Sequence, residues 1–133
     1  MGFYDRFILP PLLEMAMSAK PIQYQRRKVV PLAEGRVLEI GFGAGHNLPF
    51  YDPTKVTHLW GLEPVPAMRA RAMKRAGGLK FPLEFLDLKA EDIPLDDKSA
   101  DTVLVTYTLC TIPEVVRALK GMRRVLKLSL IHI

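Results

Sequence analysis

Three glycines in alternate positions follow a short apolar run, as expected where a buried strand turns into a ligand-binding loop. Residues 37–40 lead into Gly41, Gly43 and Gly45. Glycine adopts positive φ and has no Cβ, so backbone N–H groups can approach a ligand closely. The dinucleotide fingerprint spaces its glycines as G-x-G-x-x-G, whereas His46 holds the position of the last glycine here. The spacing therefore favours a nucleoside cofactor without phosphates over a pyrophosphate.

A carboxylate follows the next apolar segment. Glu63 and Pro64 come directly after it. A carboxylate at this place can accept hydrogen bonds from both hydroxyls of a ribose, each charge-assisted bond contributing about 1.5–3 kcal/mol. The alternative is an ordinary surface glutamate before a turn. A second acid, Glu39, lies inside the apolar run and is predicted to orient the loop or a cationic group near it.

An acidic loop and a threonine-rich loop follow the last two predicted strands. The first loop contains Glu91 and Asp92, and either carboxylate could accept from the exocyclic amine of an adenine; a solvated acidic turn is the alternative. In the second, Tyr107 and Thr108 are candidates for positioning a substrate, with simple packing as the alternative. Cys110 has neither zinc-type spacing nor a partner base, so no metal site is predicted.

Strands that alternate with helices must position these residues. The apolar pattern predicts four strands, at residues 37–40, 57–62, 83–88 and 101–106. A helix is predicted at residues 66–76, and another begins at Pro113 with an apolar stripe of Val115, Val116, Leu119, Met122 and Leu126. This order predicts an α/β, Rossmann-like parallel sheet of about four strands flanked by helices. Such sheets bind ligands at the carboxyl ends of their strands.

Residues 1–35 are predicted to be a helical segment ahead of the sheet. Pro10 and Pro11 are expected to divide its apolar start into two short helical pieces. A further helix is predicted from Pro21 to Val30, with its basic cluster at residues 25–28 on a solvated face. The segment is interpreted as a lid or packing cover. An interfacial membrane helix, and hence peripheral membrane contact, is the alternative, disfavoured by sparse basic residues.

Size and charge set further bounds. The chain has 133 residues and a formal net charge of +5. Its basic residues are scattered and lack an aromatic stacking motif, so no nucleic-acid partner is predicted. The lone Cys110 fits a reducing, cytoplasmic compartment. No apolar run approaches the roughly 20 residues of a membrane span. The pattern leaves the oligomeric state unassigned.

Several motifs in order carry a family resemblance. They are V-L-E-I-G-F-G-A-G-H-N-L-P-F-Y, G-L-E-P, A-E-D-I-P-L-D-D-K-S-A-D-T-V-L-V and M-R-R-V-L-K. Over residues 36–127 the chain resembles a class I S-adenosylmethionine-dependent methyltransferase of the methyltransferase type 11 group. Through N-L-P-F-Y and T-L-C-T-I-P it resembles the thiol methyltransferase-like branch.

The resemblance implies S-adenosyl-L-methionine as cofactor and a small-molecule methyl acceptor with a thiol, amine or hydroxyl group. The glycines would approach the methionine part of the cofactor, Glu63 the ribose hydroxyls, and Ala90 with Glu91 the adenine. Family members often have Asp at the position of Lys89, so this chain departs from the pattern there. The complete set predicted for the cofactor is Glu39, Gly41, Gly43, Gly45, Asn47, Glu63, Pro64, Ala90, Glu91, Asp92 and Thr106.

Catalysis in such a family requires no triad. A sulfonium already activates its methyl group, so the protein mainly aligns a nucleophile, which can contribute roughly 7–11 kcal/mol. Tyr107 and Thr108 are therefore the only catalytic candidates. Two other functions compete: a nicotinamide- or flavin-dependent oxidoreductase on a Rossmann fold, disfavoured by His46, and a non-catalytic cofactor-binding module.

The end of the sequence differs from the family, which continues with Pro-Gly-Gly and further strands. Residues 128–133 read L-S-L-I-H-I, which a sequencing-library transposon end encodes in frame, so they are predicted to be a non-native tail. The hypothesis is thus a methyltransferase core at residues 36–127, truncated before the C-terminal strands of the full fold. Its fourth strand would then be an exposed edge.

Overall fold

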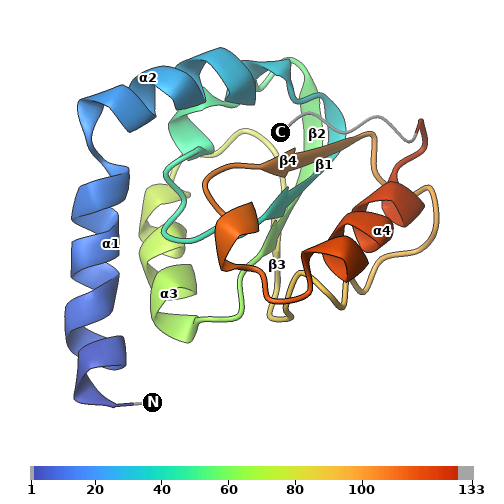
Figure 1. Cartoon of the computed structure of the whole chain (residues 1–133). Helices are drawn as coiled ribbons and strands as arrows, with labels where there is room; N and C mark the ends of the chain where they lie inside the picture. Colours follow the sequence, from blue (N-terminus) through green and yellow to red (C-terminus); the bar gives the residue numbers. More distant parts are fainter. Residues whose placement is uncertain (1, 129–133) are drawn as a thin grey trace.

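Four parallel strands form the centre of the molecule (Figure 1) in a computed structural model that describes residues 2–128. In chain order they are β1 (Gly35–Ile40), β2 (Val56–Leu62), β3 (Leu83–Leu86) and β4 (Thr102–Val105). The strand order is β3-β2-β1-β4, with every pair parallel. The chain therefore builds outward from β1 in one direction and then adds β4 on its other side. Ligands of such sheets bind where the order reverses, here beyond the carboxyl ends of β1 and β4.

Both faces of β1 are buried, which explains why its sequence is almost continuously apolar. Leu38 and Ile40 pack in one core with residues of α4 (Val115–Val125). Val37 packs in a second core on the other face, with residues of α3 (Pro66–Arg75) and with Val30. The predicted parallel sheet flanked by helices is confirmed. The predicted strands match in place, but the third ends at Leu86, two residues early.

Strand β4 lies at one edge of the sheet that residues 2–128 form. Beside its start, the chain leaving α4 begins to pair: the N–H of Ala100 donates to the carbonyl of Val125 at 2.8 Å, and the N–H of Lys127 donates to Ala100 at 2.9 Å. The predicted non-native tail is described only at Leu128, which is exposed. Residues 129–133 of that tail lie outside the described residues.

The start of the chain forms one helical column and not two separate pieces. A π-helical segment, η1 (Tyr4–Ile8), runs directly into α1 (Leu9–Met17). The predicted break at Pro10 and Pro11 is therefore wrong. Both prolines lie in the first turn of α1, where a missing N–H is tolerated. Within residues 2–128, no helix is long and apolar enough to cross a bilayer.

Helix α2 (Lys20–Val29) begins with Pro21 in its first turn, close to the prediction. Figure 1 shows α1 beside α3, with α2 crossing above the sheet. The predicted stripe of α4 needs one correction, because Val116 is 63% exposed whereas Ala118, Met122 and Val125 are fully buried. The buried side follows the i, i+4, i+7 rows from Ala118, and Val116 lies off that face.

Candidate functional site

The glycine loop after β1 lies tightly against two other elements. Gly41 has φ +66°, and a Cβ there would lie 2.3 Å from the Oγ1 of Thr108 in the loop after β4. Gly45 has φ +79°, and a Cβ there would lie 3.3 Å from Ala72 of α3. Larger residues at these positions would suffer both clash and backbone strain. Gly43, at φ +59°, would place a Cβ in ordinary contact with the Cε of Met68 at 3.7 Å, so backbone conformation is a stronger reason for glycine there than lack of space.

Glu63, at the end of β2, is tied to this loop. Its Oε2 accepts a hydrogen bond from the backbone N–H of Gly43 at 2.9 Å, and its Oε1 accepts from the N–H of Val65 at 3.0 Å. The side chain is 8% exposed. Because each carboxylate oxygen can accept two hydrogen bonds, one acceptor position on each oxygen remains for another donor.

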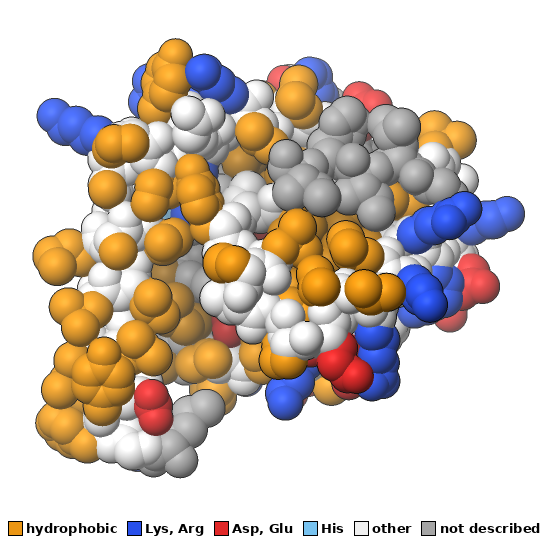
Figure 2. Space-filling model, viewed as in Figure 1, with side chains coloured by type: hydrophobic (Ala, Val, Ile, Leu, Met, Phe, Trp, Pro, Cys, Tyr) orange, Lys and Arg blue, Asp and Glu red, His pale blue; other side chains and the backbone are white. Residues whose placement is uncertain are grey.

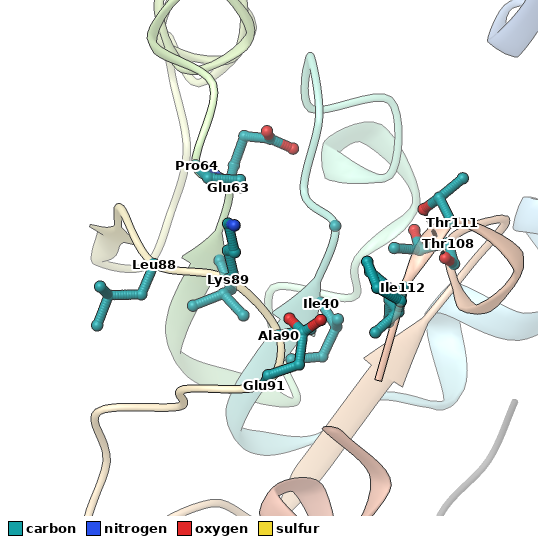
Figure 3. A pocket seen from close by; sticks show the side chains of 13 residues that line it. Ile40, Glu63, Pro64, Leu88, Lys89, Ala90, Glu91, Thr108, Thr111 and Ile112 are labelled. Atoms are coloured by element: carbon teal, nitrogen blue, oxygen red, sulfur yellow. Dashed lines mark hydrogen bonds between the residues drawn. The ribbon is translucent and has the colours of Figure 1, made fainter. Parts of the chain in front are cut away.

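A cavity of about 280 Å³ opens at the carboxyl ends of the strands. Its wall is made by Ile40, Gly41, Leu62, Glu63, Pro64, Leu88, Lys89, Ala90, Glu91, Thr108, Thr111, Ile112 and Pro113. Figure 3 shows Glu63 and Pro64 on one side, Leu88 to Glu91 on a second, and Thr108, Thr111 and Ile112 on a third. The volume is close to the lower limit of small-molecule pockets. Loops from all four strands therefore meet around one hollow.

Six of the predicted residues line this cavity: Gly41, Glu63, Pro64, Ala90, Glu91 and Thr108. Asp92 does not, although it neighbours Glu91. Its Oδ1 lies 2.6 Å from the Nη2 of Arg117 on α4, in an exposed ion pair. The carboxylate of Glu91 instead accepts a long hydrogen bond, 3.4 Å, from the N–H of Glu114. Geometry thus separates two carboxylates that the sequence left as equal candidates.

Most of the apolar part of the wall was missing from the sequence prediction, which included only Pro64 and Ala90. Leu62 and Leu88 come from the ends of the second and third predicted strands, and Ile112 and Pro113 from the T-L-C-T-I-P segment. The signal was present, since apolar residues just beyond parallel strands lie where such sheets bind ligands. The other predicted residues were glycines and side chains that can form hydrogen bonds with a ligand.

Glu39, Asn47 and Thr106 lie away from this wall, in a buried polar network. The amide nitrogen of Asn47 donates to Glu39, and also to the Oγ1 of Thr106 at 3.0 Å. The hydroxyl of Tyr51 donates to the second oxygen of Glu39 at 2.9 Å. Arg26 of α2 completes the network, because its Nη1 donates to the amide oxygen of Asn47. Asn47 thus links a helix of the N-terminal segment to β1.

Burial governs the protonation of this network. Burial raises the pKa of Glu39 to about 7, against the hydrogen bonds of Tyr51 and Asn47 and the charge of Arg26, which lower it. Burial likewise lowers the pKa of Arg26, against the raising effect of Glu39. The pKa of Tyr51 rises well above 10.0, through burial and the nearby Glu39. Burial thus favours the uncharged forms of Glu39 and Arg26, and the hydrogen bonds of the network oppose it at Glu39.

The sequence placed Arg26 on a solvated face, and this prediction is wrong. Arg26 is 5% exposed, and its Nε is buried without a hydrogen-bond partner. Helical spacing gave the clue, because Arg26 shares a face with Ile22 and Val29, while Arg27 and Lys28 lie on the outside.

A second cavity, about 270 Å³, adjoins Arg26 on the other side of the loop after β4. It is lined by Gln25, Arg26, Val29, Val105, Thr106 and Tyr107. Tyr107 has φ +55°, unusual for an aromatic residue, and its ring centre is 5.4 Å from the guanidinium carbon of Arg26. The two catalytic candidates therefore face different hollows, Thr108 the first and Tyr107 the second. Among residues 2–128, no three His, Cys, Asp or Glu side chains gather as a metal site.

Known proteins resemble this chain in sequence and in fold. The chain matches a methyltransferase domain family over residues 38–129. It is 32% identical over 93 residues to a phosphatidylethanolamine N-methyltransferase of Cereibacter sphaeroides, covering 68% of this chain and 45% of that protein. It is 34% identical over 77 residues to a tRNA U34 carboxymethyltransferase of Shewanella pealeana, covering 56% of this chain and 23% of that protein. The chain thus spans less than half the length of either.

A solved structure agrees. A SAM-dependent methyltransferase of Thermotoga maritima, described as a possible histamine N-methyltransferase, is 31% identical, with a TM-score of 0.68, covering 93% of this chain and 55% of that one. The family and fold imply S-adenosyl-L-methionine as the cofactor. The glycine loop, the carboxylate of Glu63 and the hollow between them fit such a group. On its sequence match and its fold, the chain belongs to the methyltransferase domain family.

Proposed function

We propose that this protein binds S-adenosyl-L-methionine in the cavity at the ends of β1 to β4 and transfers its methyl group to a small-molecule thiol, amine or hydroxyl. One observation carries the proposal: the carboxylate of Glu63 and the glycine loop are hydrogen-bonded to each other at the wall of one cavity. The family membership favours methyl transfer over the competing oxidoreductase function.

The wall supplies the groups that a nucleoside needs. Glu63 has acceptor positions left for two ribose hydroxyls. Ile40, Leu62 and Ile112, which line the hollow, offer apolar surfaces to a base. Glu91, beside Ala90, would accept from the exocyclic amine of adenine. Gly41, which lines the cavity and has no Cβ, would let the backbone approach the methionine part.

The remaining predicted residues act indirectly in this proposal. Glu39 and Asn47 would stabilise the glycine loop through their hydrogen bond to each other. Asn47 also accepts a hydrogen bond from Arg26 and so connects the loop to the N-terminal segment. Residues 1–35 would serve as a lid and residues 36–127 as the methyltransferase core. Pro64 is the exception, since it lines the cavity beside Glu63. Thr106 would hold Asn47, from which it accepts a hydrogen bond. Gly45, which has no Cβ, would let the glycine loop pass close to α3.

Bound S-adenosyl-L-methionine would supply an activated methyl group on its sulfonium. The protein then has to hold the acceptor in line and exclude water, which can contribute roughly 7–11 kcal/mol without a catalytic base. Thr108 lies at the first cavity and Tyr107 at the second, so the loop after β4, which carries both, would position the acceptor. The relatives carry names that refer to a lipid and a tRNA, so the family varies on the acceptor side.

Calorimetric titration of S-adenosylhomocysteine and of NAD tests the cofactor. We expect saturable binding of S-adenosylhomocysteine and none of NAD; tight NAD binding without S-adenosylhomocysteine binding would overturn the proposal. Transfer of a labelled methyl group to a panel of thiols, amines and alcohols then tests the activity. Cofactor binding without transfer to any member would favour the non-catalytic module instead.

A further inference from the structure

The N-terminal helix has apolar side chains on both of its sides. On its inner side, Leu9, Pro10 and Leu13 line a cavity of about 340 Å³ together with Val65 and Met68 at the start of α3. The rest of its surface carries six exposed apolar residues, here called the N-terminal apolar face: Phe3, Tyr4, Phe7, Ile8, Leu12 and Met15. Phe7 lies at the edge of this face, since it also lines a cavity with Val65 and Pro66. A helix on a protein surface normally has polar residues on its outer side, so an exposed apolar face of this kind indicates an interaction surface.

Spacing makes these residues one continuous surface. Tyr4, Ile8 and Leu12 recur every four residues, as do Phe3 and Phe7, with Met15 further along the same row. The rings of Phe3 and Phe7 are 4.9 Å apart, and Phe3 and Met15 at the two ends are each 70% exposed. Figure 2 shows hydrophobic side chains gathered over this helix, on the left of the molecule.

The charges around the face indicate what covers it. Residues 1–33 contain five basic side chains, Arg6, Lys20, Arg26, Arg27 and Lys28, against two acidic ones, Asp5 and Glu14. Their net charge of +3 is thus most of the +5 of the whole chain. All the basic side chains except Arg26 are exposed. Exposed Tyr24 adds an aromatic ring beside the Nζ of Lys28, at 4.2 Å.

An apolar helical face with aromatic residues and flanking basic side chains matches the interface of a membrane with anionic lipids. We propose that the N-terminal apolar face binds flat to the surface of a bilayer that contains anionic phospholipid, with Arg6, Lys20, Arg27 and Lys28 at the headgroups. This inference does not depend on the methyltransferase activity. Val65 and Pro66 line a cavity with Asp5, Arg6 and Phe7, and they directly follow Pro64 of the cofactor cavity. Membrane binding would therefore bring the mouth of that cavity close to the bilayer.

Flotation of the 133-residue chain with lipid vesicles tests the proposal. We expect the chain to float with vesicles of phosphatidylcholine containing about one-third phosphatidylglycerol, more strongly than with phosphatidylcholine alone, and less strongly at high salt. The double variant Phe7→Glu/Leu12→Glu should weaken binding at least about ten-fold, because it places two charges on the apolar face. The pair Arg27→Glu/Lys28→Glu should remove the preference for anionic vesicles.

The matched control is Val116→Glu on α4, an apolar side chain of similar exposure on another part of the molecule, which should bind vesicles as the native chain does. Circular dichroism shows whether each variant is folded, and S-adenosylhomocysteine titration shows whether it still binds the cofactor product. Loss of vesicle binding can then be distinguished from unfolding and from failure of the proposed cofactor site. Absence of vesicle binding by the native chain, or binding unchanged by Phe7→Glu/Leu12→Glu, would overturn the proposal. So would a dimer that the same double variant dissociates in the absence of vesicle binding, since the face would then bind a second copy.

Discussion

The carboxylate of Glu63 accepts a hydrogen bond from the backbone N–H of Gly43 at 2.9 Å. This contact joins the end of β2 to the loop after β1, across the carboxyl edge of the sheet. It is the relationship on which a cofactor site here depends, because sugar and amino-acid ends of the same ligand would contact these two segments.

Glu63→Gln should weaken S-adenosylhomocysteine binding about 10- to 100-fold, since a charge-assisted hydrogen bond contributes about 1.5–3 kcal/mol. The amide would also place a donor beside the N–H of Gly43 or Val65. Calorimetry measures the dissociation constant. Glu34→Gln, an exposed carboxylate before the opposite end of β1, is the control and should bind normally. An unchanged dissociation constant for Glu63→Gln would contradict the assignment.

Gly41→Ala should destabilise the fold more than Gly78→Ala. Both glycines have positive φ, but a Cβ at Gly41 would lie 2.3 Å from Thr108, whereas nothing lies within 4 Å at Gly78. The excess loss should be about 1–3 kcal/mol, the usual range for overpacking. Urea unfolding measures it. Adding Thr108→Ala to Gly41→Ala should restore part of the difference; equal losses at the two glycines would show that Thr108 does not constrain the loop.

Glu91→Gln should reduce S-adenosylhomocysteine affinity, and Asp92→Asn should not. Glu91 lines the cavity, whereas Asp92 forms an exposed ion pair with Arg117 at 2.6 Å. A loss of about ten-fold is expected for Glu91, and a stability change of about 0–1 kcal/mol for Asp92, as is usual for an exposed pair. Titration of both variants with S-adenosylhomocysteine shows which carboxylate contributes to cofactor binding. The reverse order of effects would assign the adenine to Asp92.

Glu39 should make stability depend on pH in the neutral range. Its folded pKa, raised by burial from 4.5 to about 7, means that the folded state holds this proton more tightly than the unfolded chain does. The contribution of protonated Glu39 to the free energy of unfolding is therefore complete below pH 4.5 and is lost as the pH rises through about 7. The shift corresponds to about 3 kcal/mol at most.

Urea unfolding of the native chain and of Glu39→Gln at several pH values measures this effect. The variant cannot titrate at position 39, so its stability relative to the native chain should rise between about pH 4.5 and 7. Asp101, whose pKa is lowered against its burial by hydrogen bonds from Arg36 and Lys127, acts below pH 3.8 and serves as the background common to both proteins. Parallel pH profiles would contradict the raised pKa of Glu39.

Local pattern alone determined the sheet and the start of the site. The apolar run before Gly41 and the alternation of strands and helices predict a parallel sheet, and parallel strands bring their carboxyl ends to one edge. Gly41 and Glu63 could be paired from sequence for that reason. Each residue comes immediately after the last residue of its strand, so the position of the strand end fixes the position of the residue.

Tertiary packing decided which polar side chains face the cavity. Glu91 and Asp92 are neighbours in the chain, yet α4 draws Asp92 away through Arg117. Arg26 is buried because Asn47 and Thr106, which come from distant segments, accept hydrogen bonds from its guanidinium. Glu39 points to the face of β1 that holds Asn47 and Tyr51, opposite to that of Leu38 and Ile40. Local periodicity indicates which face of a helix or strand a side chain occupies, but contacts between segments far apart in sequence decide which partners it meets there.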